Sequence, residues 1–182
     1  MDLTQQLQQK YNKEVFGKLV ADIGNDVEKF DKLIQVFFNS GTHIRLASHA
    51  SWVLSNCVEN HPILINPYME QIIDLVESPI HETAKRNMIR AWQFINIEEP
   101  YQGLVLNICF DYLNKKETSI ACRVYSLVVV ANLTKHFPEL KNELIVIIED
   151  QLPYQSPAFI STGKKILAKL KRVKIKPKEL IQ

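Results

Sequence analysis

Prolines recur along the chain at a fixed interval, and this spacing constrains the fold more than any other feature of the sequence. Pro62, Pro100 and Pro138 follow one another at an even interval of 38, and the dipeptides Ser78-Pro79 and Ser156-Pro157 are separated by twice 39. Self-similarity at such a period is typical of solenoids, in which each repeat packs only on its neighbours. Apolar residues between the prolines recur at the period of an α-helix, which predicts a pair of helices in each repeat.

The Ser-Pro dipeptides predict helix starts. A serine at the N-cap accepts a backbone N–H, and a proline in the first turn has no N–H to leave unpaired. In other repeats Thr118, and Ser40 or Thr42, are the predicted caps. Asn25-Asp26 offers a further cap, with Glu28 three residues after Asn25 as a capping box. The predicted helices cover residues 3–12, 13–23, 26–39, 42–59, 66–77, 81–97, 101–115, 118–135, 139–152 and 156–172.

No segment alternates apolar and polar residues long enough to predict a strand, so the fold class is all-α. We predict an α-α superhelix of about four helix pairs with an N-terminal capping helix. It forms a single domain over residues 1–172, and residues 173–182 form a basic C-terminal tail. Glutamines near the N-terminus fit the polar outer face that a terminal repeat requires.

The second helices of the predicted pairs share a register. A small or β-branched residue precedes a basic one at Ile44-Arg45, Ala84-Lys85 and Cys122-Arg123, and Trp52, Trp92 and Val130 follow at matching positions. On these residues the chain resembles the HEAT family of α-helical repeats over residues 26–172. The resemblance implies a superhelical scaffold. Thr42, Glu82 and Thr118 stand where the family often has an Asp before the basic residue, so that pairing is not carried over.

The chain also resembles small bacterial all-helical repeat proteins of the Bacteroidetes type, of about this length. The matching segments are 51–54, 108–113, 136–141 and 156–159. Such proteins are sometimes labelled adenylosuccinate lyase. True lyases are more than twice as long and carry a Ser-Ser and Met-Pro-x-Lys signature loop, which this sequence lacks. We therefore do not predict lyase activity.

Tryptophans and basic residues recur on the second helices. Trp52 and Trp92 are predicted core positions, because valine and leucine hold the same register elsewhere; the alternative is an aromatic pair that stacks on a base or a peptide. Arg45, Lys85 and Arg123 are predicted to be structural residues of the repeat; the alternative is a basic stripe for phosphates or acidic peptides.

The best candidate contact patch in the body of the chain is Arg86, Arg90 and Gln93, with Lys85 beside them. These residues lie at i, i+4 and i+7, and thus on one helix face. The predicted equivalents in the flanking repeats are Leu46, Ala50 and Val53, and Val124, Val128 and Ala131. The repeat therefore does not require these polar residues; the alternative to a binding role is a solvated helix face.

The charge of the chain is unevenly distributed. Lys plus Arg total 22 and Asp plus Glu total 20, for a net charge of +2, but residues 164–182 alone carry +7 and the rest −5. This basic end predicts contact with nucleic acid, anionic lipid or an acidic protein face, and the alternative is a solubilising tail. The candidate binding residues here are Lys171, Arg172, Lys174 and Lys176.

Several classes of function are disfavoured. The N-terminus has no secretory signal, no apolar run reaches transmembrane length, and three cysteines within apolar helical patterns predict reduced thiols in a cytoplasmic protein. Cys57 and His61 alone do not make a metal site, and no catalytic motif or cofactor loop is visible. We predict a non-enzymatic scaffold or adaptor whose partner is another protein. The alternative is a DNA-binding or DNA-alkylation-repair-like HEAT protein, with Trp52 and Trp92 as its aromatics and Arg86 and Arg90 on phosphates.

Overall fold

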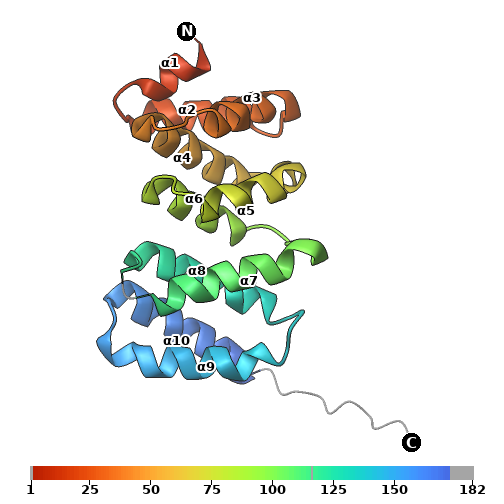
Figure 1. The fold of residues 1–182 in the computed structure, drawn as a ribbon, viewed down its shortest axis with the longest axis vertical. Coiled ribbons are helices and arrows are strands. Elements are labelled where there is room, and N and C mark those ends of the chain that lie inside the picture. Colours follow the sequence, from red (N-terminus) through yellow and green to blue (C-terminus); the bar gives the residue numbers. More distant parts are fainter. Residues whose placement is uncertain (1, 116, 173–182) are drawn as a thin grey trace, which may run out of the picture.

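The structure is a computed structural model that describes residues 2–115 and 117–172. Helices stack into an elongated rod, with α1 at one end and α9 and α10 at the other (Figure 1). Two N-terminal helices, α1 (Leu3–Gln8) and α2 (Lys13–Ile23), precede four pairs: α3 (Val27–Phe38) with α4 (Ile44–Asn60), α5 (Met69–Glu77) with α6 (Glu82–Trp92), α7 (Glu99–Asn114) with α8 (Ile120–Leu133), and α9 (Leu140–Gln151) with α10 (Pro157–Arg172). The described residues contain no strand, and the predicted all-α superhelix is confirmed.

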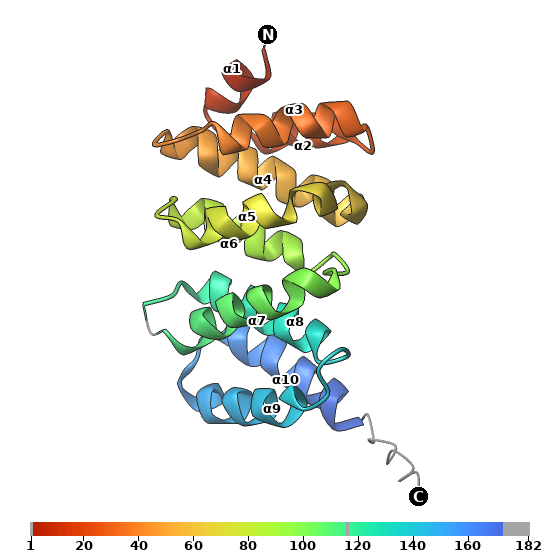
Figure 2. The ribbon, with the colours of Figure 1, turned by 45° about the vertical axis from the view of Figure 1, so that its right-hand side comes forward.

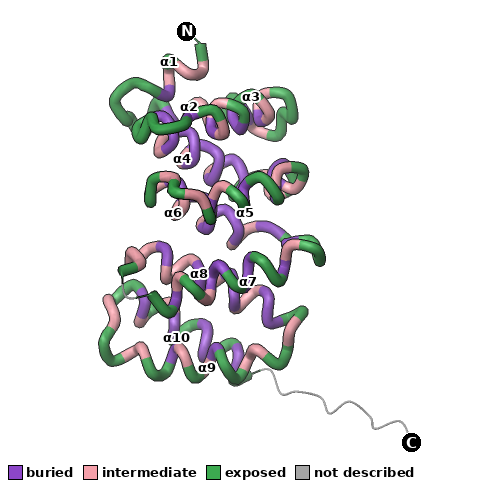
Figure 3. The backbone as a smooth tube through the Cα atoms, in the orientation of Figure 1, coloured by how far each residue is buried: buried purple, intermediate pink, exposed green. Residues whose placement is uncertain are grey.

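The four pairs form two layers. The second helices, α4, α6, α8 and α10, pack on one another in succession, and each first helix, α3, α5, α7 or α9, packs on the second helix of its own pair (Figure 2). Buried positions recur along the second helices, between exposed stretches (Figure 3). The buried apolar residues form one continuous cluster from Leu7 to Leu170, so the stack has a single core.

The predicted helix starts are partly wrong. Ser156 caps α10 as expected, since its Oγ accepts from the Phe159 N–H at 3.4 Å. Ser78 instead ends α5 and donates its hydroxyl to the Leu75 carbonyl at 2.7 Å, while His81 caps α6. The α8 cap is Ser119, one residue after the predicted Thr118. Of the predicted Asn25-Asp26 pair, Asp26 caps α3 by accepting from the Lys29 N–H at 3.0 Å.

Three predicted helices are shortened by three or more residues at one end. The first ends at Gln8, four residues early. The helix predicted over 66–77 begins at Met69, after a 3-10 segment, η1 (Pro62–Tyr68), and a second 3-10 segment, η2 (Leu152–Tyr154), follows α9. The helix predicted over 81–97 ends at Trp92, because the Gln93 and Phe94 N–H groups bond to carbonyls only three residues back. A wide turn thus follows α6.

Candidate interaction surface

Charge separates between the two helix layers. The second helices carry ten basic and two acidic side chains, a net charge of +8, whereas the first helices carry three basic and ten acidic side chains, a net charge of −7. The overall charge of +2 conceals this separation. A partner that meets the second-helix layer therefore meets a cationic surface.

On α6, α8 and α10, the least buried side of the helix forms a surface that we call the outer face. Because successive residues of an α-helix turn by about 100°, positions i, i+4 and i+7 share one side. On each of α6, α8 and α10, one set of residues at i, i+4 and i+7 is partly or fully exposed throughout. The outer face consists of Arg86, Arg90 and Gln93 on α6, Val124, Val128 and Ala131 on α8, and Ser161, Lys165 and Ala168 on α10.

The predicted equivalents on α4 do not share this side. Leu46, Ala50 and Val53 are buried in the core. The side of α4 that turns away from the core holds Arg45, which is exposed, and Trp52, which is half-buried. The alignment of α4 with α6 was therefore wrong for this patch, while that of α6 with α8 agrees with the burial pattern.

Arg90 ties two repeats together. Its Nη1 donates to the Ser55 hydroxyl at 2.7 Å and to the Ser55 carbonyl at 3.2 Å, and its Nη2 forms an ion pair with Glu59. The guanidinium also lies 5.2 Å from the centre of the Phe94 ring. The charge of Arg90 is thus directed towards α4, and this residue is a poor candidate for an external ligand.

The other two residues of the predicted patch differ from Arg90. The Gln93 carbonyl accepts from Asn132 Nδ2 on α8 at 3.2 Å, which places Gln93 at the junction between repeats. Arg86 is half-buried and has no hydrogen-bond or ion-pair partner within the described parts of the chain. Arg86 is therefore the member of the patch whose charge is available to a partner.

Arg45, Lys85 and Arg123 occupy three unlike environments. Arg45 is exposed and donates to the Gln8 carbonyl at 3.4 Å. Arg123 donates to Gln151 at 2.7 Å and to Gln155 at 3.1 Å. Burial lowers the pKa of the Arg123 guanidinium below its ordinary value. The three residues do not form a continuous basic stripe.

Lys85 faces a surface cavity of about 290 Å³ between α5, α6 and α7. Glu77, Asp111, Tyr112 and Lys115 also line it, and Lys115 pairs with Asp111 at 2.7 Å. Burial, with a smaller contribution from the Glu82 carboxylate, raises the pKa of the Tyr112 phenol above its ordinary value. Charges of both signs line the cavity, and the phenol stays protonated, so the cavity offers hydrogen-bond donors and acceptors to a polar group.

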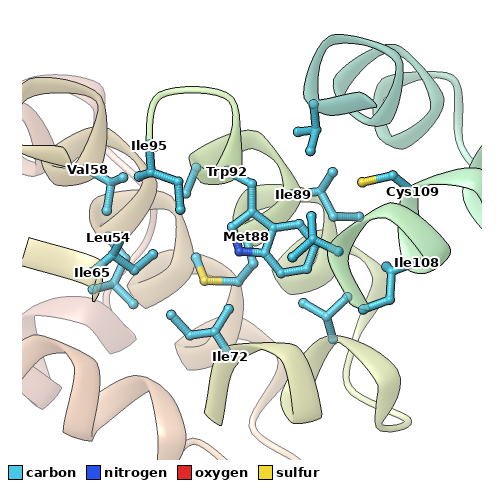
Figure 4. Packing of buried hydrophobic residues seen from close by; sticks show 14 of the residues in the cluster. Leu54, Val58, Ile65, Ile72, Met88, Ile89, Trp92, Ile95, Ile108 and Cys109 are labelled. Atoms are coloured by element: carbon cyan, nitrogen blue, oxygen red, sulfur yellow. The ribbon is translucent and has the colours of Figure 1, made fainter. Parts of the chain in front are cut away.

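The two tryptophans do not have equivalent surroundings. Trp92 is 1% exposed and packs among Met88, Ile89 and Ile72 (Figure 4). Trp52 is half-buried and makes an edge contact with Tyr11 at 5.6 Å between ring centres. Trp92 is therefore unavailable for stacking on a base or a peptide.

The basic end of α10 has one internal ion pair. Lys171 pairs with Glu149 of α9 at 2.6 Å, and both side chains are about half exposed. Arg172 is exposed, as are Lys164, Lys165 and Lys169, and these four have no acidic partner in the described part of the chain. Lys174 and Lys176 lie outside the described residues, as does the predicted tail.

The N-terminal helices cover the outward side of α4, which the sequence did not predict. His49 Nδ1 lies 2.7 Å from the Leu7 carbonyl, and the His49 ring meets the Phe16 ring at 5.0 Å between centres. A second missed contact joins α6 to α8, where Cys122 Sγ and Ser119 Oγ donate to Glu82 Oε1 at 3.1 and 3.2 Å. The signal available in the sequence was the separation of about one repeat between polar partners.

The three cysteines are buried free thiols. Burial raises the pKa of Cys57, Cys109 and Cys122 from 9.0 to about 12. Within residues 2–115 and 117–172, no group of three or more His, Cys, Asp and Glu side chains is arranged to hold a metal ion. No helix of those segments has the length and apolar composition needed to span a bilayer.

These thiols predict a pH dependence of stability. Above pH 9 the unfolded thiols ionise while the folded ones remain protonated, so the free energy of unfolding should fall as pH rises from 9 towards 12. Urea unfolding at several pH values measures this effect. Lysines and tyrosines also titrate in this range, so Cys57→Val is the matched control and should show a smaller decrease. An equal decrease in both proteins would contradict the assignment.

Comparison with known proteins adds one match. A family model described as a HEAT repeat domain matches residues 3–170. No curated protein and no solved structure matches the chain.

Proposed function

We infer that this chain, which belongs to the HEAT repeat family, is a non-enzymatic scaffold that binds another protein through the outer face of α6, α8 and α10. HEAT repeats are helical scaffolds that commonly mediate protein interactions. The observation that carries the proposal is the separation of charge, with +8 on the second helices and −7 on the first.

Unpaired cations support this choice of surface. Arg86 on α6, and Lys164, Lys165 and Lys169 on α10, have no acidic partner in the described structure. None of these charges forms a hydrogen bond or an ion pair within the described structure. A cationic surface that does not stabilise its own fold is suited to steer an acidic partner into contact.

Nucleic acid is the second candidate, because the second-helix layer carries the charge that phosphates require. Two features disfavour it. Val124, Val128 and Ala131 interrupt the cations at the centre of the outer face, and Trp92 is too deeply buried to stack on a base. The DNA-alkylation-repair-like hypothesis used both tryptophans as stacking residues, and Trp92 is too buried to serve as one.

An affinity pull-down from the native host, with and without nuclease, tests the proposal. The wild-type chain should capture the same proteins in both arms. A reversal variant of the outer face, Arg86→Glu with Lys165→Glu, should lose them. A matched variant of the acidic layer, Glu70→Lys with Asp74→Lys, changes exposed residues of α5 and should retain them. Capture that nuclease abolishes, or that the outer-face reversal leaves unchanged, would overturn the proposal.

A further inference from the structure

The centre of the outer face is apolar. On α8, Ala121, Val124, Val128 and Ala131 are all partly exposed, and they line the side opposite the buried residues Ser126 and Val130. We call these four residues the α8 strip. Over ten residues an α-helix rises about 15 Å, so the strip is long enough to contact roughly three turns of another helix.

The chain itself shows how such a face is covered. The outward side of α4 is packed by the N-terminal helices, where Tyr11 and Phe16 meet Trp52 at 5.6 and 6.1 Å between ring centres. Among the described residues, α8 packs mainly on α6, α7, α9 and α10, and no further helix makes comparable contact with it. The α8 strip is half-buried against the core, and no further described helix covers its outward side, whereas helices cover the counterpart on α4.

The charges beside the α8 strip indicate which kind of partner can bind there. The α6 and α10 helices pack on either side of α8, and in the register of the outer face Arg86 on α6 and Lys165 on α10 match strip positions Val124 and Val128. Neither cation has an acidic partner in the described structure. The chain's own C-terminal residues carry Lys174, Lys176 and Lys178 against Glu179, so they have the same sign as these two cations. Like charges repel, and the tail is thus a poor occupant.

A second copy and a nucleic acid also fit less well. The most acidic helix is α5, with three acidic and no basic side chains, and its large apolar residues are buried or half-buried. On α9, which also carries three acidic side chains, Val146 is the only large apolar side chain that is well exposed, at 64%. One valine offers little to cover the strip. A phosphate backbone offers no apolar surface to Val124 and Val128, although it satisfies the cations.

We propose that the α8 strip binds an acidic amphipathic helix of another protein. The apolar side of that helix packs on Val124, Val128 and Ala131, and its acidic residues pair with Arg86 on one flank and Lys165 on the other. This is the helix-in-groove mode of recognition, with apolar anchors at i, i+3 or i+4, and i+7. The inference rests on the proposed function and specifies the chemistry of the partner.

The test uses a fluorescent synthetic helix of about 18 residues, or five turns, with leucine at i, i+4 and i+7 and glutamate on both flanks. Fluorescence anisotropy with the full chain measures its affinity. A second peptide replaces every glutamate with lysine. We expect the acidic peptide to bind and the basic one not to, and the affinity to fall as salt rises, since flanking ion pairs are screened.

Variants locate the binding. Val128→Glu and Arg86→Glu should each weaken binding of the acidic peptide at least about tenfold, which corresponds to about 1.4 kcal/mol. The matched control Val146→Glu places the same charge on an exposed valine of α9 and should leave binding unchanged. Thermal unfolding accompanies each variant. If Val128→Glu fails to fold, Arg86→Glu decides the matter, because Arg86 forms no hydrogen bond or ion pair in the described structure.

Four outcomes would overturn the inference. These are no binding of the acidic peptide, equal binding of the basic peptide, unchanged binding by both outer-face variants, or displacement of the peptide by duplex DNA. Self-association in sedimentation that Val128→Glu and Val146→Glu both abolish would assign the strip to a second copy. If the peptide fails but the outer-face reversal still loses its captured proteins, only this inference falls and the proposed function stands.

Discussion

Replacing Trp92 with alanine should lower the free energy of unfolding by about 3–5 kcal/mol, the range for truncating a large aromatic residue in a core. Trp92 is 1% exposed and lies between the two layers, where Figure 4 shows it beside Met88 and Ile72. Truncation leaves a cavity that these neighbours can fill only by shifting helices. Urea unfolding followed by circular dichroism measures the loss.

Trp52→Ala is the matched control. Trp52 is half-buried and contacts the Tyr11 and Phe16 rings at the edge of the stack, so its loss should cost clearly less. Trp92→Phe should also be milder, because the Trp92 indole N–H is buried without a hydrogen-bond partner and the phenylalanine removes it. If Trp52→Ala were as costly as Trp92→Ala, the assignment of the two tryptophans to different environments would be wrong.

Replacing Arg123 with methionine should cost about 2–4 kcal/mol, the second largest effect expected. Arg123 joins α8 to the last repeat through Gln151 and Gln155, it also donates to the Leu113 carbonyl at 3.4 Å, and its guanidinium lies 5.7 Å from the centre of the Phe159 ring. The variant leaves two partly buried amides without their donor. Urea unfolding again gives the loss.

Two further variants separate geometry from charge. Arg123→Lys keeps the charge but cannot reach both glutamines at once, so it should recover only part of the stability. Arg86→Met removes an arginine that has no partner in the described structure, and should change stability by no more than about 0.5 kcal/mol. A large loss in Arg86→Met would mean that Arg86 serves the fold and is not free to bind a partner.

The periodicity of the sequence was sufficient to predict the helices and their pairing. Each predicted helix has a counterpart in the structure. Apolar residues spaced three or four apart lie on one side of a helix, and that side is buried when the helix packs on a neighbour. The caps were less predictable. Ser78-Pro79 and Ser156-Pro157 look alike in sequence, yet Ser78 ends a helix and Ser156 begins one. Whether a serine lies at the start or the end of a helix depends on where the adjoining loop turns. The packing of the loop against other helices sets the position of that turn.

The candidate site was predictable only in part. The sequence singled out Arg86, Arg90 and Gln93, but it could not show that Arg90 pairs with Glu59 and that Arg86 does not pair. The helical spacing of the sequence places both arginines on the same helix face and does not distinguish between them. The partner of Arg90 lies almost one repeat away along the chain, and only the packing of α6 on α4 brings the two together.

The sequence by itself determined that this protein is a stack of helix pairs, that its cysteines lie in apolar helices, and that positive charge gathers at its C-terminal end. The tertiary structure decided which side of each helix faces outward. Trp52 and Trp92 look like equivalent positions in sequence, whereas the buried counterpart of Trp92 is Leu54, two residues after Trp52. An offset of two residues turns a side chain by about 200° around a helix, from the core to the surface. Periodicity fixes the length of a repeat to within a few residues, but the rotation of each helix follows from packing against its neighbours. The outer face therefore became visible only in three dimensions.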